Sequence, residues 1–564
     1  MIKLLGIKSN KPFNYGKENS IQILKDICCL YINTSSKEWQ ISLNDNIESG
    51  NDFNSLKAYF SRLVDKLDKA NRSKSNRKIV IFINRLGLSY KMLINLINEN
   101  IENYYFNESR RGKYLSSIYT KHFIFRNFST LAGKVSSIWD LDKKYEFNSE
   151  NEVGIIRNFV NFRLSQGFTL KNLDLSFAAC TQKAFYKKFS TKEKKELVGE
   201  ITEKRRAVSR PIFKDLMKQN NSGFLGFNKE YQYKIVNNVF AFDISSSYPS
   251  QFIKGNDFPI GHIVYSEPAA HNLKRLINND RWFLAVFSSD YEYRNGILNP
   301  KQMNNKYYYF INKYDYKCLR LLGKKFCDYK FHFERLLVCD EEGYLNTTFR
   351  THLHNAYLEK QSSTGGKRYQ LKTEIDTLYG KGIQQRSINN INPINYYKNE
   401  EHYICPQFSF HALSRARFEL ISIINKTKPE CWINSDTDCI KTTDSNITKI
   451  IEQRNKEIIE ENKIAGFDSD CGTWKFEGIY PRFLQLCNKV YCYEENNKIN
   501  CTFAGCLETA WKEYFKEKTI DESFEILSKD KIVIPGGVKQ IKENNDKTKE
   551  YVLSDYIIKK EANT

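Results

Sequence analysis

The chain has 564 residues, of which 41% are hydrophobic, so it is long and apolar enough for several domains with cores. Its 87 basic and 66 acidic side chains give a net charge of +21, which favours a polyanionic partner such as a nucleic acid. No apolar run could span a membrane and the 14 scattered cysteines fit no usual zinc spacing, so we expect a cytoplasmic protein with reduced thiols and no membrane partner.

The first third of the chain has the pattern of an α/β domain. The apolar run at 79–84 predicts a buried strand, with a helix at 92–101 behind it. Residues 152–164 have helical periodicity. The charged segment 191–206 predicts a helix that links this domain to the rest.

The remainder mixes strands and helices. Residues 239–244 predict a strand that ends in an acid, and residues 255–350 predict an inserted domain of short strands and polar loops. We expect one long helix at 357–379, interrupted by Gly365-Gly366. A hairpin is predicted at 431–443, and strands are predicted from residue 520 onward.

Three acids are placed for metal chemistry. Asp243 ends an apolar strand, where a carboxylate is costly unless it binds something such as a divalent cation. The segment after it, 243–250 (DISSSYPS), would turn the chain into a helix whose amides suit triphosphate oxygens. Asp436 and Asp438 occupy the hairpin turn, beside Asp243 if the strands are neighbours. Paired carboxylates suit two-metal phosphoryl transfer, although an isolated DTD is usually a polar turn.

A basic stripe follows the inserted domain. Lys360, Arg368 and Lys372 are spaced to lie close to one helix face, and Tyr379 falls about two turns further along it. Such a face suits an incoming nucleoside triphosphate. Taken alone, a basic stripe is usually only a solvated surface.

Together and in this order, these segments resemble motifs A, B and C of family B DNA polymerases. Residues 243–250 resemble DxxSLYPS, residues 372–380 resemble KxxxNSxYG and residues 434–439 resemble YxDTDS. Residues 489–491 match the KxY motif that contacts the primer strand. The short chain and the insertion between motifs A and B are similar to the protein-primed branch of small bacteriophages and linear plasmids, from about residue 25 onward.

The resemblance implies an α/β multidomain right hand with an N-terminal RNase H-like, exonuclease-type domain. The expected parts are the exonuclease-like domain at 1–185, palm at 186–254, an insertion resembling terminal-protein region one at 255–346, fingers at 347–386, a short terminal-protein region two at 387–406, palm at 407–515 and thumb at 516–564. Because the second region is short, we expect reduced processivity and strand displacement.

The resemblance also implies the site residues. Asp243 and Asp438 would hold two Mg²⁺ or Mn²⁺ ions, assisted by the Ile244 carbonyl, with Asp436 as a supporting catalytic acid. Tyr248 would pack against the deoxyribose. The remaining expected nucleotide contacts are Lys360, Arg368, Lys372 and Tyr379, and the expected DNA contacts are Gly223, Ser250, Lys489 and Tyr491.

Motif B departs from the family pattern. Asp376 stands where the family has Asn, and its negative charge should weaken triphosphate binding. Thr377, Asn434 and Cys439 are further departures, and none of them removes an expected metal ligand.

The exonuclease motifs depart more. Tyr31 and Asn33 stand in place of the acids of the first motif, and the segment at 84–89, which includes Leu88, keeps Asn84 but no acid. The third motif keeps only Glu152. One carboxylate cannot hold two metal ions, so we predict that 3′–5′ exonuclease activity is absent. If this alignment is shifted, the true ligands would be among Asp26, Asp45 and Asp140.

The leading hypothesis is a DNA-directed DNA polymerase that uses dNTPs and a primed template and starts from a terminal protein or a primer strand. A specialised nucleotidyltransferase, template-independent or defensive, is an alternative because residues 220–224 keep only Gly223 of the family's template-contacting YxGG motif and because the exonuclease acids are lost. The third reading, a non-catalytic DNA-binding remnant, is disfavoured by the intact Asp243 and Asp438.

Overall fold

The computed structural model separates the chain into two compact units, and each mixes helices with strands as predicted. The first unit comprises Met1–Ala184, Ser363–Gln370 and Gln540–Val552, and the second comprises Phe185–Ser362, Leu371–Lys539 and Leu553–Thr564. The structure describes residues 22–23, 26–33, 36–71, 77–84, 86–109, 112–132, 138–166, 168–170, 173, 183–205, 209–220, 222–383, 403–543 and 549–559.

The first unit is built on a mixed sheet of order β4-β3-β2-β5-β8-β7-β6, with β1 also paired to β5. Its strands are β1 (Gln22–Ile23), β2 (Cys28–Ile32), β3 (Trp39–Leu43), β4 (Asn46–Gly50), β5 (Arg77–Ile83), β6 (Asn103–Ser109), β7 (Gly112–Tyr119) and β8 (Phe123–Asn127). Along β5, Val80 and Phe82 enter one core while Ile81 and Ile83 enter the other. Burial on both faces explains why the sequence of this strand is a continuous apolar run.

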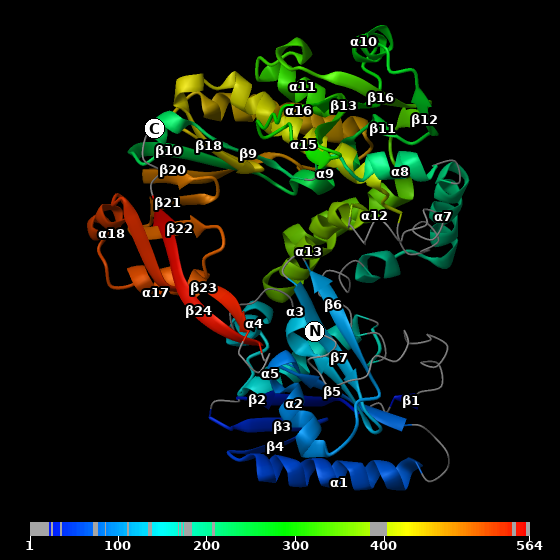
Figure 1. The fold of residues 1–564 in the computed structure, drawn as a ribbon, viewed down its shortest axis with the longest axis vertical. Coiled ribbons are helices and arrows are strands. Elements are labelled where there is room, and N and C mark those ends of the chain that lie inside the picture. The colour runs from blue at the N-terminus through cyan, green and yellow to red at the C-terminus, as the bar shows by residue number, and fades with distance from the viewer. Residues whose placement is uncertain are drawn as a thin grey trace. The chain divides into compact units, whose positions relative to one another are not determined.

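Helices cover both faces of this sheet (Figure 1). They are α1 (Phe53–Asn71), α2 (Leu86–Ile97), α3 (Phe128–Ala132), α4 (Ile138–Tyr145) and α5 (Glu152–Ser165). The predicted helix at 152–164 is present as α5, capped by the Asn151 side chain. The helix predicted at 92–101 lies earlier in the chain, because the left-handed backbone of Asn98 (φ 52°) follows its last turn.

The second unit is built on an antiparallel sheet of order β22-β21-β20-β10-β19-β18-β9. Its strands are β9 (Phe224–Phe227), β10 (Ile235–Ile244), β18 (Trp432–Thr437), β19 (Cys439–Thr442), β20 (Trp474–Cys487), β21 (Val490–Glu495) and β22 (Lys498–Phe503). The strand predicted at 239–244 is the second half of β10, and the predicted hairpin is β18 with β19. The strand that ends in Asp243 therefore lies beside the hairpin that carries Asp438.

Outside its insertion, the second unit also contains helices (Figure 1). They are α7 (Thr191–Arg205), α8 (Arg210–Leu216), α9 (Ser247–Lys254), α12 (Thr347–Ser362), α13 (Gly365–Gly382), α15 (Pro406–Lys426), α16 (Ile447–Ile464), α17 (Glu508–Phe515) and α18 (Ile520–Leu527). Leu420 and Ile421 of α15 share a core with Phe242 and Ile244 of β10. None of the helices within the described ranges has the length and apolar character needed to cross a membrane.

The insertion forms its own antiparallel sheet, of order β12-β16-β13-β15-β14. Its elements are β11 (Phe258–Pro259), β12 (Ile263–Ser266), α10 (Ala270–Asn278), β13 (Phe283–Ser289), β14 (Lys301–Met303), β15 (Lys306–Asn312), α11 (Lys313–Leu321), β16 (His332–Cys339) and β17 (Glu342–Gly343). The prediction of strands and loops missed both helices. The α11 helix begins with a capping box formed by Asn312 and Asp315.

The interruption predicted at Gly365-Gly366 is present, but the segment 357–379 forms two helices and not one. The helix α12 ends at Ser362 and α13 begins at Gly365, whose left-handed backbone (φ 52°) turns the chain. A Cβ atom on Gly366 would lie 2.1 Å from the ring of Tyr145, so only glycine permits this close approach. The basic residues predicted to share one helix face are therefore divided between two helices.

The C-terminal segment begins with α18 rather than with a strand. It ends in the two-stranded sheet of β23 (Lys531–Glu543) and β24 (Lys549–Lys559). Most of the predicted short region at 387–406 lies outside the described residues. The seven-part division of the chain stays a prediction.

Candidate active site

Asp243 and Asp438 are brought together by strand pairing. Asp243 lies opposite Cys439 in the pairing of β10 with β19. The backbone amide of Ile244 donates a hydrogen bond of 2.9 Å to the carbonyl of Asp438. Both acids are therefore attached to adjacent strands near the centre of the sheet.

Each acid stands beside a left-handed residue other than glycine. Thr437 (φ 70°) lies between Asp436 and Asp438 in the turn that joins β18 to β19, and Ser246 (φ 53°) begins the turn from β10 into α9. A β-branched residue such as Thr437 seldom adopts this conformation, because its Cβ substituents crowd the backbone. Backbone strain of this kind concentrates at functional sites.

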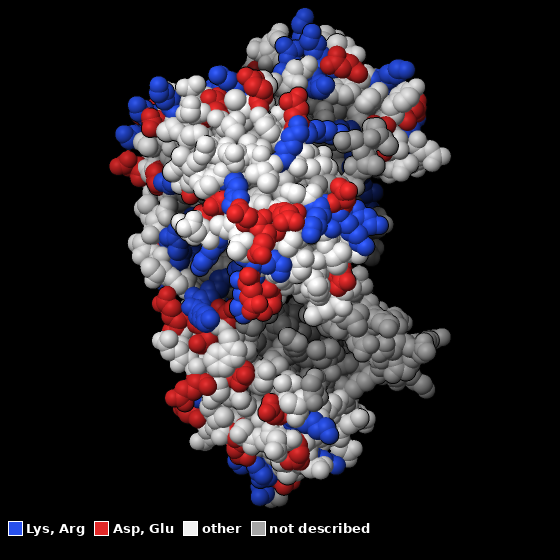
Figure 2. All heavy atoms as spheres, turned by 90° about the vertical axis from the view of Figure 1, so that its left-hand side faces the viewer, with Lys and Arg blue, Asp and Glu red and all other residues white. Residues whose placement is uncertain are grey.

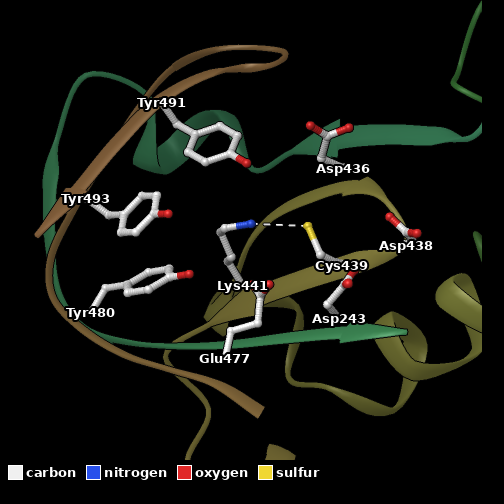
Figure 3. Close-up of a pocket in the computed structure, with 9 residues that line it drawn as sticks. All are labelled: Asp243, Asp436, Asp438, Cys439, Lys441, Glu477, Tyr480, Tyr491 and Tyr493. Atoms are coloured by element: carbon white, nitrogen blue, oxygen red, sulfur yellow. Dashed lines mark hydrogen bonds between the residues drawn. The ribbon is translucent and has the colours of Figure 1, made fainter. Parts of the chain in front are cut away.

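The acids line a polar hollow of about 200 Å³ (Figure 3). One side of the hollow is formed by residues of β10, β18 and β19, and the other side by residues of β20 and β21. The hollow is lined by Asp243, Asp436, Asp438, Cys439, Lys441, Glu477, Tyr480, Tyr491 and Tyr493. In Figure 3 the three tyrosine hydroxyls point toward Lys441 and Cys439, and the aspartates lie on the other side of these two residues.

Burial and mutual repulsion disfavour the charged forms of these acids. Burial raises the pKa of Asp438, and the charge of Asp243 raises it further. Burial likewise raises the pKa of Asp243, with Glu477 as the second cause, and Lys441 and Lys372 oppose this shift. Two such carboxylates are stabilised by cations between them, and the site is therefore built to attract positive charge.

The predicted primer-contact residues lie at the edge of the hollow. Lys489 occupies the turn between β20 and β21, and its ammonium lies 3.2 Å from a carboxylate oxygen of Asp436. The ring of Tyr491 stacks on Phe483 at 5.5 Å, while Tyr480 and Tyr493 stack at 4.1 Å. The structure thus joins KxY directly to motif C.

The predicted nucleotide-contact residues of the second unit gather around Tyr248. Its ring lies 4.1 Å from that of Tyr379. Burial raises the pKa of Asp376 while Lys360 and Lys372 lower it, so these three charges lie near one another. The charge of Asp376 also acts on Tyr248, Tyr379 and Asp438. The Lys360 ammonium donates to the hydroxyl of Ser246.

Two backbone hydrogen bonds anchor the turn after Asp243. The amide of Ser245 donates to the carbonyl of Thr473, and the amide of Gly472 donates to the carbonyl of Ser245, each at 2.9 Å. The hydroxyl of Tyr357 in α12 donates to Asp470 at 2.8 Å. The loop before β20 therefore fixes the position of motif A.

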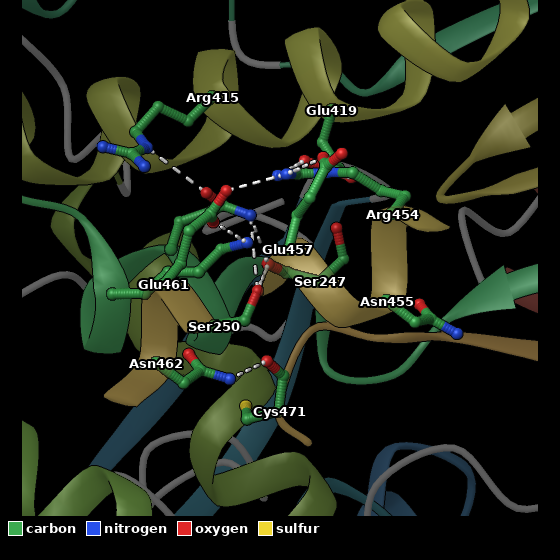
Figure 4. Close-up of polar contacts among 12 residues, drawn as sticks. Ser247, Ser250, Arg415, Glu419, Arg454, Asn455, Glu457, Glu461, Asn462 and Cys471 are labelled. Carbon is green, nitrogen blue, oxygen red and sulfur yellow. Dashed lines mark hydrogen bonds and ion pairs between the residues drawn. The ribbon is translucent and has the colours of Figure 1, made fainter. Parts of the chain in front are cut away.

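Buried ion pairs hold the helix that follows motif A (Figure 4). Lys254, at the end of α9, lies 2.8 Å from Glu461 of α16. Arg454 binds both Glu461 and Glu419, at 2.8 and 2.7 Å, and so ties α16 to α15. Breaking one partner of such a pair leaves an uncompensated buried charge, so the network opposes movement of these helices.

Three further residues predicted to contact nucleotide or DNA do not line the hollow: Arg368, Ser250 and Gly223. Arg368 belongs to the first compact unit, and the predicted face shared with Lys360 does not exist because the helix is broken. The Ser250 hydroxyl is buried and donates to the carbonyl of Ser247 at 2.8 Å, and its DNA contact stays a prediction. At Gly223, a Cβ atom would lie 2.7 Å from the side chain of Thr437, so this glycine supports the motif C turn.

The predicted exonuclease positions lie on the first unit. Tyr31 is paired with Gln40 across β2 and β3, and Gln40 donates a hydrogen bond of 3.1 Å to Glu152. Asn84 binds both backbone groups of residue 32, at 3.2 and 3.1 Å. Asn33 follows β2, and Leu88 lies in α2. Thr34, Ser35 and Arg85 fall outside the described residues.

The alternative exonuclease ligands are engaged locally. Asn44 donates to Asp26 at 2.9 Å, and Asp45 lies 3.4 Å from Arg157. Asp140 lies in the first turn of α4. Throughout the part of the chain that the structure describes, no group of three or more His, Cys, Asp or Glu side chains is arranged to hold a metal ion.

The sequence reasoning missed four residues that line the hollow. Lys441 lies two residues after Cys439 on β19, and Tyr493 lies two after Tyr491 on β21, so the two-residue period of a strand was the available signal. Glu477 and Tyr480 gave no such signal. Glu477 is the extra residue of a β-bulge between β20 and β10, which a sequence pattern does not reveal.

The chain is similar in structure to Phi29 DNA polymerase. The match to that enzyme with primer-template DNA has a TM-score of 0.63 at 15% identity and covers 95% of this chain and 100% of the other. The match to its complex with primer-template DNA and incoming nucleotides has a TM-score of 0.64 at 14% identity and the same coverage. The chain therefore shares the fold of Phi29 DNA polymerase. The expected polymerase architecture is thereby confirmed.

No protein-family model matches the chain, and the search of curated proteins found no match.

Proposed function

We propose that this protein is a DNA-directed DNA polymerase that extends a primer on a template with dNTPs. One observation carries the proposal: Asp243 and Asp438 meet on adjacent central strands of a polymerase fold, beside Lys489 and Tyr491. The similar Phi29 structures contain primer-template DNA and incoming nucleotides, and the same classes of ligand suit the basic and aromatic groups described above.

The acids fit two Mg²⁺ or Mn²⁺ ions by the chemistry of their donors. Asp243 and Asp438 offer carboxylate oxygens, and the Ile244 carbonyl would assist. Since no third side chain completes a cage among the described residues, the triphosphate would supply the remaining oxygens. Bound there, the ions would activate the primer hydroxyl and neutralise charge on the triphosphate.

The protein groups would position the two reactants. Lys360 and Lys372 would bind triphosphate oxygens, for which Lys360 must release Ser246. Tyr248 would lie against the deoxyribose, and Tyr379 behind it would limit its movement. Lys489 and Tyr491 would hold the primer end. Holding both reactants in one site would make their reaction effectively unimolecular. The primer hydroxyl would attack the α-phosphate in line with the departing pyrophosphate.

We propose further that the first unit lacks 3′–5′ exonuclease activity. The one acid that survives from the expected motifs, Glu152, accepts a hydrogen bond from Gln40, and Tyr31 and Asn33 offer no carboxylate. Two metal ions need more acidic oxygens than this.

Protein priming is a separate part of the proposal. The insertion at 255–346 lies between motifs A and B in the chain and forms a sheet of its own. The resemblance to the protein-primed branch implies an insertion at this position. A terminal protein would then present the first hydroxyl to the acids. Formation of a covalent protein–dNMP adduct in the absence of a nucleic-acid primer would support this part.

Primer extension on a defined template tests the function directly. The wild type is compared with Asp438→Ala, and the 5′-labelled primer is also incubated without nucleotides. Template-dependent extension that is lost in the variant, with the primer undegraded, is expected. Primer shortening would contradict the exonuclease proposal. Extension that ignores the template would favour a specialised nucleotidyltransferase, and no phosphodiester formation would favour a non-catalytic remnant.

A further inference from the structure

Lys441 is a buried lysine inside the hollow that holds the acids. It lies on β19, opposite Ala241 of β10, and its residue is only 3% exposed. Its ammonium lies 3.1 Å from the sulfur of Cys439 and 4.8 Å from the centre of the Tyr491 ring (Figure 3). Burying an ammonium group is costly, so its presence here requires compensation.

The compensation does not come from an ion pair. No carboxylate of the described residues lies within 4 Å of the Lys441 ammonium, although Asp243, Asp436 and Glu477 line the same hollow. Aromatic rings supply part of it, because the face of Tyr491 attracts a cation. The titratable groups that line the hollow together with Lys441 are Asp243 from β10, Asp436 from β18, Asp438 from the turn before β19, Cys439 from β19, Glu477 and Tyr480 from β20, and Tyr491 and Tyr493 from β21.

We propose that Lys441 is a positioning residue for the nucleotidyl transfer: its fixed charge holds the Tyr491 ring and offsets part of the negative charge that Asp243 presents to cations. The inference rests on the proposed function for the role of Tyr491 at the primer end. The charge effect on the acids depends on the geometry of the hollow alone.

The two roles predict opposite changes when the charge is removed. Without Lys441 the acids form a more negative site, so a divalent cation binds more tightly. At the same time Tyr491 loses a partner on its face, so the primer end binds less tightly. A lysine that merely filled space would not shift cation affinity in this direction.

Lys441→Met tests the inference because methionine keeps the unbranched shape and removes the charge. Lys441→Arg is the rescue variant, since it restores the charge. The matched control is Lys475→Met, an exposed lysine of β20 that lies opposite Asp243 and pairs with Asp470. Binding of Mn²⁺ alone is measured without DNA, and the KM for primer-template is measured separately from kcat.

We expect Lys441→Met to bind Mn²⁺ about threefold or more tightly and to raise the primer-template KM about fivefold, with Arg restoring both. Mn²⁺ affinity that is unchanged or weakened in a folded Met variant, or equally shifted in Lys475→Met, overturns the inference. If Lys441→Met does not fold, Lys441→Gln is compared with Lys441→Arg instead. Equal Mn²⁺ affinity in these two variants would then overturn the inference. A wild type without polymerase activity would refute the proposed function, and the Mn²⁺ comparison would still decide the charge effect.

Discussion

At the scale of single residues, the candidate site keeps charges that the fold itself disfavours. Asp243 and Asp438 are partly buried and close together, and burial followed by mutual repulsion raises the pKa of Asp438. The two close carboxylates therefore lower the stability of the metal-free fold, and the same closeness lets them attract cations. The same reasoning applies to Asp376 in motif B.

Asp438→Asn should stabilise the metal-free protein and abolish synthesis. The raised pKa means that the native state holds its proton to higher pH than the unfolded chain does, so the wild type loses stability as pH rises through the mildly acidic range. Asparagine has no proton to lose, so we expect the free energy of unfolding at about pH 7.5 to be about 1–2 kcal/mol higher in the variant. Denaturant unfolding between pH 5 and pH 8 measures it. An unchanged pH dependence would show that the repulsion is absent.

Asp376→Asn should lower the KM for dNTP about threefold to tenfold, with little change in kcat. The change removes a negative charge beside Lys360 and Lys372, the proposed triphosphate contacts. The control is Thr377→Ser, because the Thr377 hydroxyl already binds the carbonyl of Thr373 within its own helix at 2.7 Å. Steady-state kinetics with one correct nucleotide would decide, and a raised KM would show that Asp376 assists binding.

At the scale of elements, the site depends on loops that hold motif A in place. Gly472 has a left-handed backbone (φ 87°), and a Cβ atom there would lie 2.6 Å from the side chain of Ser250. The amide of Gly472 also holds the carbonyl of Ser245. This loop therefore couples β20 to the turn that follows Asp243.

Gly472→Ala should reduce primer extension at least tenfold and destabilise the protein by about 2–4 kcal/mol, from backbone strain together with the clash. Gly466→Ala is a matched control, with a similar backbone (φ 92°) and no atom within 4 Å of the added Cβ. It should cost only the strain, about 1 kcal/mol. Activity and thermal unfolding are measured for both, and equal effects would exclude a special role for the contact with Ser250.

The elements that the sequence predicted are those whose pattern is local. The hairpin of β18 and β19 and the end of β10 follow from apolar strands bounded by acids. The interruption at Gly365-Gly366 was predicted, but its effect was not: it divides the segment into two separate helices, and the contact of Gly366 with Tyr145 joins residues that are distant in the sequence. Glu477 escaped notice for a similar reason, because a bulge depends on the partner strand.

At the scale of the whole molecule, the net charge of +21 is spread among charges of both signs. Figure 2 shows lysine and arginine side chains intermingled with aspartate and glutamate on the face in view. A polymerase substrate would therefore meet separate basic groups rather than one continuous positive surface on that face. Phosphate contacts made in this way still release counterions from DNA.

Affinity for primer-template DNA should accordingly fall steeply with salt. If about five phosphates are contacted, the logarithm of the association constant should fall with the logarithm of salt concentration with a slope of about −4 to −5. Fluorescence anisotropy with a labelled primer-template, at KCl concentrations from about 50 to about 300 mM, measures this slope. A slope near zero would argue against a DNA substrate.

The left-handed residues beside the acids, Thr437 and Ser246, bear on how this protein can be improved. Glycine or asparagine would relieve strain at either position, so a library selected for heat resistance alone would accumulate such replacements. Each replacement would also loosen a turn that carries an acid, and at position 437 it would remove the methyl group that packs against Gly223. Thermostable variants obtained by that route would be stable proteins whose acids are held less firmly, and a useful selection must therefore also score the proposed activity in every round.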